Sequence, residues 1–118
     1  MTNFDIDIAP LLPLPAAVFH ILISLGDGDK HGYAVMQEVA DRTDGAVRMS
    51  PGTLYGSIKK MLDEGLIEEL FRRGHADDER RRYYRLTKFG RAVAAAEAER
   101  LAAMLHHARL NGLVPRKG

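Results

Sequence analysis

The stretch 50–62 constrains the fold most, because it combines a strong helix start with a single apolar stripe. Ser50 can accept hydrogen bonds from free backbone N–H groups, and Pro51 suits the first helical position, where no N–H is needed. The apolar residues that follow lie at helical spacing. They are Leu54, Ile58, Met61 and Leu62. The sequence therefore predicts a helix that packs one side against a core.

The opposite face of this predicted helix is unusual for a solvent-exposed surface. It carries Gly52, Thr53, Gly56, Lys59 and Lys60. A glycine in a helix interior costs about 1 kcal/mol relative to alanine, so two of them one turn apart indicate that another surface approaches the backbone closely. With a threonine and two lysines beside them, we expect that surface to be a nucleic-acid groove. The alternative is a plain amphipathic helix with poor surface residues.

The charged residues are unevenly distributed, although the formal net charge of the 118-residue chain is only +1. Before Lys30 there are four acidic residues and no lysine or arginine, whereas residues 80–91 include six basic residues and no acidic one. A local basic patch on a nearly neutral chain is typical of a protein that binds nucleic acid specifically.

The composition excludes several other kinds of site. The chain has no cysteine, which excludes disulfides, thiolate zinc sites and cysteine nucleophiles. Its five histidines show no metal-binding spacing, and the sequence contains neither a nucleophile elbow nor a phosphate-binding loop. We therefore expect no metal, no cofactor and no enzymatic activity. The apolar run 16–25 is too short to span a bilayer, so we expect a cytoplasmic protein without a membrane anchor.

The first half of the chain is predicted to be largely helical. The expected elements are a loose, proline-rich arm over 1–13, helices over 14–25 and 31–43, and a short strand over 46–49. Phe19 and Ile23 lie off the main apolar stripe of the first helix, which indicates contact with a second subunit. Tyr33 is expected to belong to the apolar core positions of the second helix.

The second half is predicted to form a β-hairpin and one long helix. The strands are expected over 66–73 and 81–86, on either side of the polar turn 74–79. Alternation along the second strand places Tyr84 and Leu86 inward. Thr87 is expected to cap an alanine-rich helix over 88–110. Because this helix is about 33 Å long, its second half is expected to bury apolar side chains against another copy of the chain.

Three helices followed by a two-stranded hairpin make the winged helix-turn-helix arrangement. The predicted fold is therefore mainly α with a small antiparallel β-hairpin. Its expected divisions are an N-terminal arm (1–13), the winged helix-turn-helix domain (14–86), a C-terminal dimerisation helix (87–112) and a tail (113–118). In this arrangement the third helix enters the major groove, and the hairpin, or wing, lies against the neighbouring backbone or minor groove.

Four short motifs resemble the PadR-like transcriptional regulators. They are HGY at 31–33, SPGTLY at 50–55, LDEGLI at 62–67 and RYYRLT at 82–87, together with Gly90. Each motif is weak alone, but their order and spacing across residues 14–110 are specific. The resemblance implies a homodimeric repressor that often senses a small, frequently aromatic molecule. The chain looks like the short form of the family, with a single C-terminal helix.

The candidate DNA contacts lie on the predicted third helix and on the wing. They are Ser50, Gly52, Thr53, Tyr55, Gly56, Lys59 and Lys60 on the helix, and Arg80, Arg81 and Arg82 on the wing. Further candidates for phosphate contacts are Lys30 and His31. Tyr33 is a third candidate, if it does not belong to the core.

The candidate dimer contacts come from the first and last predicted helices. They are Phe19, Ile23, Leu101, Met104, Leu105 and Ala108. An effector pocket could form across the dimer beside Phe19, Ile23 and Met104.

Two functions remain open from the sequence. The leading hypothesis is a dimeric, sequence-specific DNA-binding regulator of an inverted-repeat operator, acting as a repressor that a small aromatic effector releases. The alternative is a winged-helix module for protein–protein contact without specific DNA binding. The basic patch at residues 80–91 favours the first hypothesis, since an interaction module does not need it.

Overall fold

The computed structural model describes the backbone of residues 5–73 and 80–114 and the side chains of residues 7–71 and 82–114. Its helices are α1 (Asp5–Ile8), α2 (Ala16–Ser24), α3 (Gly32–Arg42), α4 (Pro51–Asp63) and α5 (Lys88–Leu110), with 3-10 turns η1 (Ala9–Leu11) and η2 (Leu25–Asp27). Its strands are β1 (Lys30–His31), β2 (Ile67–Arg73) and β3 (Arg80–Leu86). The predicted fold class is confirmed. The predicted turn 74–79 lies outside the described residues.

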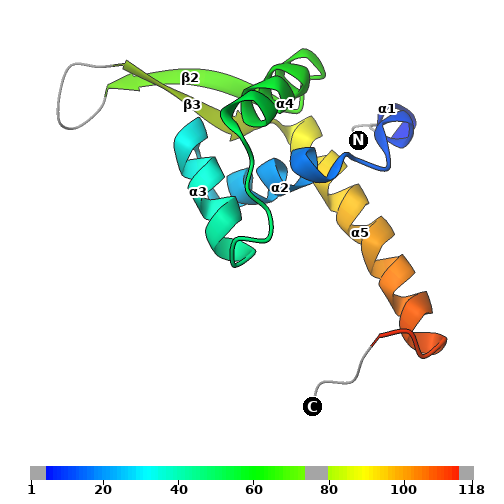
Figure 1. The fold of residues 1–118 in the computed structure, drawn as a ribbon. Coiled ribbons are helices and arrows are strands. Elements are labelled where there is room, and N and C mark those ends of the chain that lie inside the picture. Colours follow the sequence, from blue (N-terminus) through cyan, green and yellow to red (C-terminus); the bar gives the residue numbers. More distant parts are fainter. Residues whose placement is uncertain (1–4, 74–79, 115–118) are drawn as a thin grey trace.

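The helices α2, α3 and α4 pack together, whereas α5 runs outward from them as a long rod (Figure 1). Strands β2 and β3 extend from the same group of helices in another direction, as the predicted wing. The described strands pair antiparallel in the order β1-β3-β2. In this register Ile67 lies opposite Leu86, and Phe71 lies opposite Arg82. The wing and the long helix are therefore separate extensions of one core.

Strand β1 was not predicted from the sequence. Its two residues pair with the wing, Lys30 opposite Tyr84 and His31 opposite Tyr83. A two-residue strand has no periodicity of its own, so only the completed hairpin reveals it. The pairing fixes the start of α3 directly against the base of the wing.

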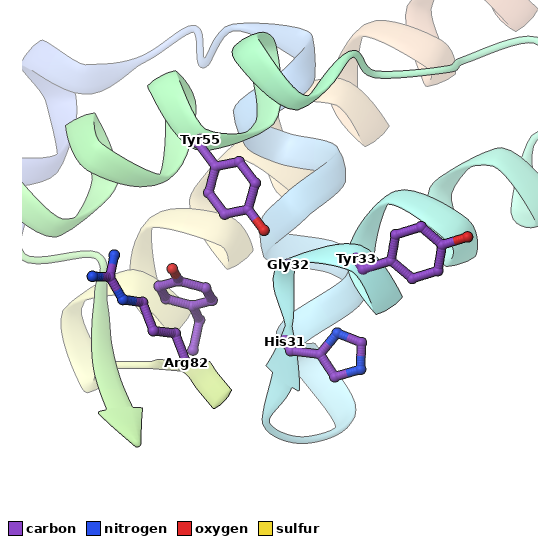
Figure 2. Close-up of a pocket in the computed structure, with 6 residues that line it drawn as sticks. His31, Gly32, Tyr33, Tyr55 and Arg82 are labelled. Carbon is purple, nitrogen blue, oxygen red and sulfur yellow. The ribbon is translucent and has the colours of Figure 1, made fainter. Parts of the chain in front are cut away.

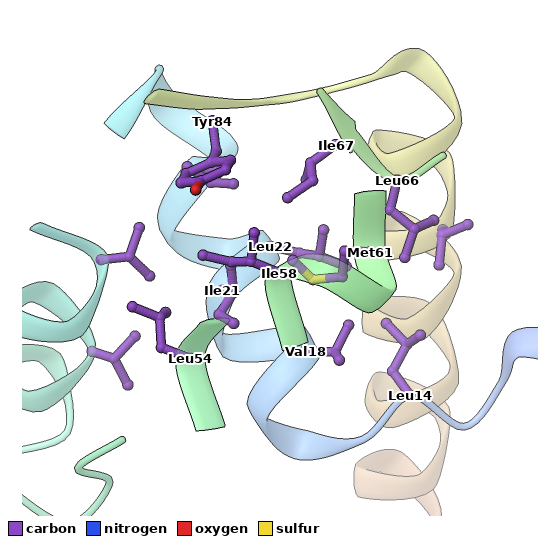
Figure 3. Packing of buried hydrophobic residues seen from close by; sticks show 14 of the residues in the cluster. Leu14, Val18, Ile21, Leu22, Leu54, Ile58, Met61, Leu66, Ile67 and Tyr84 are labelled. Atoms are coloured by element: carbon purple, nitrogen blue, oxygen red, sulfur yellow. The ribbon is translucent and has the colours of Figure 1, made fainter. Parts of the chain in front are cut away.

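The core contains the apolar stripe predicted for α4. Leu54, Ile58 and Met61 are buried against α2 (Figure 3). Val35 and Val39 of α3 close one side of the core. Its remaining buried members include Val18, Ile21, Leu22, Leu66, Ile67, Tyr84 and Val93. With one side of α4 used in this way, its glycine-bearing side is left to face outward.

The predicted starts of α4 and α5 are confirmed by their capping contacts. The Ser50 hydroxyl accepts from the Thr53 N–H at 3.1 Å, and the Thr87 hydroxyl accepts from the Gly90 N–H at 2.9 Å. Thr87 also joins the wing to α5, because its N–H donates to the Leu66 carbonyl at 3.1 Å. These contacts define a junction at which the start of β2 lies against the first turn of α5.

Two expectations for irregular segments are wrong. The expected strand at 46–49 is an irregular connection. There the Val47 N–H donates to the Thr43 hydroxyl at 3.0 Å instead of to a neighbouring strand. The expected loose arm contains α1 and η1, and it buries Ile8 in the core. Residues 1–4 of that arm lie outside the described part of the chain.

A buried carboxylate holds this N-terminal segment on α5. The Leu14 N–H donates to Glu97 Oε2 at 3.2 Å, and Glu97 is only 2% exposed. Arg100 donates to both oxygens of the same carboxylate, at 2.6 and 3.0 Å. These hydrogen bonds, above all those from Arg100, lower the pKa of Glu97 against the opposing effect of burial.

The lowered pKa of Glu97 predicts a pH-dependent contribution to stability. Because the folded pKa lies below the ordinary value of 4.5, this contribution is complete above pH 4.5 and is lost as pH falls through the folded pKa. Replacing Glu97 with glutamine should therefore lower the free energy of unfolding at pH 7 by about 1–3 kcal/mol. It should also make the free energy of unfolding decline less steeply below pH 4.5. Urea denaturation at pH 7 and at a series of pH values below 4.5 measures both effects.

The matched control is Glu99→Gln, an exposed neutralisation two residues along the same helix. It should change neither the stability nor its pH dependence. If both variants behaved alike, the assignment of the pH-dependent stability to the Leu14–Glu97–Arg100 contacts would be contradicted.

Candidate nucleic-acid interface

The outer face of α4 is open in the structure. Gly52, Thr53, Gly56, Lys59 and Lys60 are all exposed. A Cβ placed on Gly56 would meet none of the described atoms within 4 Å. The side chain of Lys59 forms an ion pair with Asp63 at 3.7 Å, and this exposed pair contributes little to stability. Another molecule can therefore approach the α4 backbone at this face.

Two shallow hollows connect α4 to the wing. One, of about 420 Å³, is lined by His31, Gly32, Tyr33, Tyr55, Arg82 and Tyr84. The other, of about 260 Å³, is lined by Tyr55, Ile58, Lys59, Leu62, Asp63, Glu69, Arg82 and Tyr84. Tyr55 from α4 and Arg82 from β3 line both hollows. The helix and the wing thus share one continuous surface.

The position of Tyr55 depends on Gly32, which is buried at the first position of α3. Figure 2 shows the Tyr55 hydroxyl pointing toward Gly32 from the facing helix. A Cβ at Gly32 would lie 2.6 Å from that hydroxyl oxygen and 3.0 Å from the ring carbon that bears it. Glycine at this position therefore allows the start of α3 and the Tyr55 side chain to lie close together. The HGY motif was the available sequence signal, but it did not reveal this contact.

The two residues beside Gly32 lie at the open edge of the hollow. His31 caps α3, because its Nδ1 accepts from the Ala34 N–H at 3.1 Å, and its ring meets Tyr83 edge-on at 5.5 Å. Tyr33 also lines the hollow, but it is 61% exposed, and in Figure 2 its ring is directed away from Tyr55 and Arg82. The expectation that Tyr33 belongs to the core is wrong, because Val35 and Val39 form the buried stripe of α3.

Some basic side chains nearby are engaged within the subunit. The Lys30 ammonium bonds to Asp27 and to the Ser24 carbonyl, which lowers the pKa of Asp27. Arg85 makes a bidentate contact with Asp29 at 2.9 and 3.1 Å, and this contact raises the arginine pKa. Both residues thus support the base of the wing.

Arg82 is exposed on β3 of the wing, and it lines both hollows together with Tyr55 of α4. Its guanidinium lies 5.8 Å from the Phe71 ring centre, within cation–π range. Beneath it Tyr84 is buried, and burial together with Glu69 raises the pKa of that phenol. The side chains of Arg80 and Arg81 lie outside the described residues, although their backbone belongs to β3. Arg82 is therefore the described wing arginine that faces the shared surface.

Within the described residues, no group of three or more histidine, aspartate or glutamate side chains could hold a metal ion. In the same part of the chain, no helix is long and apolar enough to cross a membrane.

The core helices and the paired strands define a winged-helix protein. Residues 21–96 match the family described as "Transcriptional regulator PadR-like family". The chain therefore belongs to the PadR-like family of transcriptional regulators, as the four sequence motifs predicted. Members of this family are regulators rather than enzymes.

The chain is also similar to two curated relatives. The chain is 34% identical over 86 residues to Transcriptional regulator Rv3488 of Mycobacterium tuberculosis, a match that covers 73% of this chain and 76% of the relative. It is 31% identical over 72 residues to Uncharacterized protein X of Lysinibacillus sphaericus. That match covers 61% of this chain and 65% of the relative.

Solved structures show the same fold. A transcriptional regulator from Clostridium thermocellum is 26% identical with a TM-score of 0.67, covering 83% of this chain and 92% of that one. Bacillus subtilis PadR, solved in complex with operator DNA, is 21% identical with a TM-score of 0.63. In that comparison 71% of this chain and 47% of the other are covered, and the likeness concerns the fold alone.

Proposed function

We propose that the chain is a cytoplasmic, homodimeric repressor that binds an inverted-repeat operator and is released by a small aromatic effector. In this proposal residues 14–86 form the DNA-binding domain and residues 87–112 the dimerisation helix, flanked by 1–13 and 113–118. The main support is the shared surface, because Tyr55 and Arg82 line both hollows between α4 and the wing. One duplex can meet both elements there.

The α4 face is proposed to enter the major groove. Gly52, Thr53 and Gly56 would let its backbone approach the base edges, while Ser50 keeps the helix N-terminus ordered near phosphate. The proposed phosphate contacts are Tyr55, Lys59 and Lys60 on α4, Arg80, Arg81 and Arg82 on the wing, and His31, Tyr33 and, secondarily, Lys30 at α3. The operator complex of the Bacillus subtilis neighbour supports this use of the fold.

The far half of α5 is proposed to form the dimer. Leu101, Met104 and Leu105 are 39, 57 and 42% exposed and lie on one side of the helix, next to the partly buried Ala108. On α2, Ile23 is exposed and Phe19 is partly buried, as expected for a second contact with the partner. A twofold union through these side chains would present two α4 helices to two half-sites about one DNA turn apart.

A gel shift on the chain's own promoter region tests the proposal. With salt titrated, we expect a complex on the cognate duplex at concentrations that leave a random duplex unbound, and an affinity that falls steeply with salt. A dimer that bound both duplexes equally would contradict the specific repressor. It would favour the protein–protein module instead.

Substituting Gly56 with alanine should separate folding from binding. Since a Cβ there meets open space, the change should stabilise the fold by about 0.5–1 kcal/mol through helix propensity. The added methyl group should nevertheless weaken operator binding by about 1–3 kcal/mol, because it intrudes where DNA approaches the backbone. Thermal melting and operator titration on the same preparation measure both effects. An unchanged operator affinity would contradict the approach of DNA to the α4 backbone at Gly56.

A further inference from the structure

A third hollow lies apart from the proposed DNA surface and shares no lining residue with the other two. It is shallow and open to solvent, and its volume is about 430 Å³. It is lined by Asp7 of α1, Leu11 of η1, Glu64 at the end of α4 and Phe89 in the first turn of α5. Residues far apart in sequence thus meet at one concave site.

The lining combines apolar walls with negative charge. Leu11 and Phe89 are partly buried and pack against the hydrophobic core. Asp7 is exposed and Glu64 partly so, and neither carboxylate forms an ion pair among the described residues. The two carboxylates come from different elements and border the same apolar surface.

The end of α4 adds to the negative potential. Glu64 is the C-cap of this helix, where the last carbonyl groups form the negative end of the helix dipole. A cation is favoured at such an end, and an anion is disfavoured. An apolar ligand without charge would leave both carboxylates unpaired.

We propose that this hollow binds a small hydrophobic cation, an aromatic amine or quaternary ammonium compound. Its apolar body would lie against Leu11 and Phe89, with the charged group between Asp7 and Glu64. The inference rests on the effector part of the proposed function and gives that effector a site and a charge. The site is formed within one subunit, unlike the pocket expected across the dimer beside Ile23.

The position of the hollow connects ligand binding to DNA binding. It touches the end of α4, which leads through Gly65 into the wing, and it touches α5 two residues after the Thr87 cap. A bound ligand therefore contacts both sides of the junction between the DNA-binding elements and the dimerisation helix. A change in the angle at this junction would alter the spacing of the two α4 helices in the dimer.

Calorimetric titration of the full chain without DNA tests the site. The probes are benzyltrimethylammonium and phenylacetate, which are comparable in size and opposite in charge. We expect saturable binding of the cation and none of the anion. Glu64→Gln and Asp7→Asn should each lower the affinity for the cation by about five-fold, as for a partly exposed ion pair. The matched controls Glu99→Gln and Ile23→Ala should leave this affinity unchanged.

Three results would overturn the proposal: no saturable binding of the cation, equal binding of both probes, or no effect of either carboxylate substitution. In a second arm, saturating cation should lower operator affinity several-fold in the wild type and less in Glu64→Gln. An unchanged operator affinity would overturn the effector role. If the chain bound no operator at all, the proposed function would fail, while the titration without DNA would still decide the ligand site.

Discussion

Replacing Gly90 with alanine should destabilise the fold by roughly 3 kcal/mol, as severe overpacking does. A Cβ at this position would lie 2.7 Å from the Leu66 carbonyl carbon and closer still to its oxygen. The obstructing atoms are backbone, and their carbonyl already accepts from the Thr87 N–H. The wing and α5 must therefore move apart where they meet. A melting temperature lower by roughly 10 °C is the expected readout.

The sign of this effect makes the test strict. In an exposed helix, glycine to alanine stabilises by about 1 kcal/mol, so propensity alone predicts the opposite result. Gly56→Ala is the matched control, because it places the same methyl group on a helix face with open space. If Gly90→Ala melted at or above the wild-type temperature, the close approach of α5 to β2 would be wrong.

Placing glutamates at both Leu101 and Leu105 should convert the proposed dimer to monomers and lower operator affinity by about 100-fold or more. The two side chains lie one turn apart on the exposed apolar side of α5. Burying two carboxylates in an apolar interface is strongly unfavourable. Without the partner, each half-site must be bound separately. Analytical ultracentrifugation measures the mass, and operator titration measures the affinity.

A control on the same helix uses Ala103→Glu together with His106→Glu. Both residues are exposed and lie on the opposite side of α5 by its 3.6-residue period. This variant has the same number of new carboxylates and should remain dimeric with near wild-type operator affinity. A dimer in the Leu101 and Leu105 variant, or monomers in both variants, would contradict the proposed interface.

Local chemistry made much of the fold predictable. The start of α4 follows from Ser50 and Pro51 alone, since capping involves residues only three positions apart. The start of α5 at Thr87 follows in the same way. The buried stripe of α4 follows from its periodicity, and the exposed glycine face is its complement. The helix and wing that form the candidate site could therefore be assigned before their arrangement was known.

The contacts that fix the arrangement are non-local, and sequence patterns did not reveal them. The bond between Leu14 and Glu97 joins residues 83 positions apart, and it turns a proline-rich segment into part of the core. Glu97 had no distinguishing sequence signal among the polar residues of an alanine-rich helix. The contact of Tyr55 with Gly32 and the pairing of β1 with β3 likewise exist only after the chain has folded.

Tyr33 illustrates how local position overrides residue type. A tyrosine near a valine-containing helical stripe was expected inside. It lies in the first turn of α3, in which Gly32 and Val35 are the residues that face the core. The ring is left at the surface beside the hollow that Tyr55 and Arg82 share. This exposure places it with the candidate contacts rather than with the core.

The proposed DNA binding requires that the outer face of α4 and the wing open onto one surface. Because the chain has no cysteine, a single cysteine can direct an iron chelate to a chosen position. With the chelate at Lys60→Cys on α4 or Phe71→Cys on β2, we predict cleavage at adjacent tracks within each operator half-site. With the chelate at the control position, Glu99→Cys on α5, we predict no cleavage at either track. Cleavage from the α5 position alone, or no cleavage from the α4 position while the operator is bound, would contradict a shared DNA-binding surface of α4 and the wing.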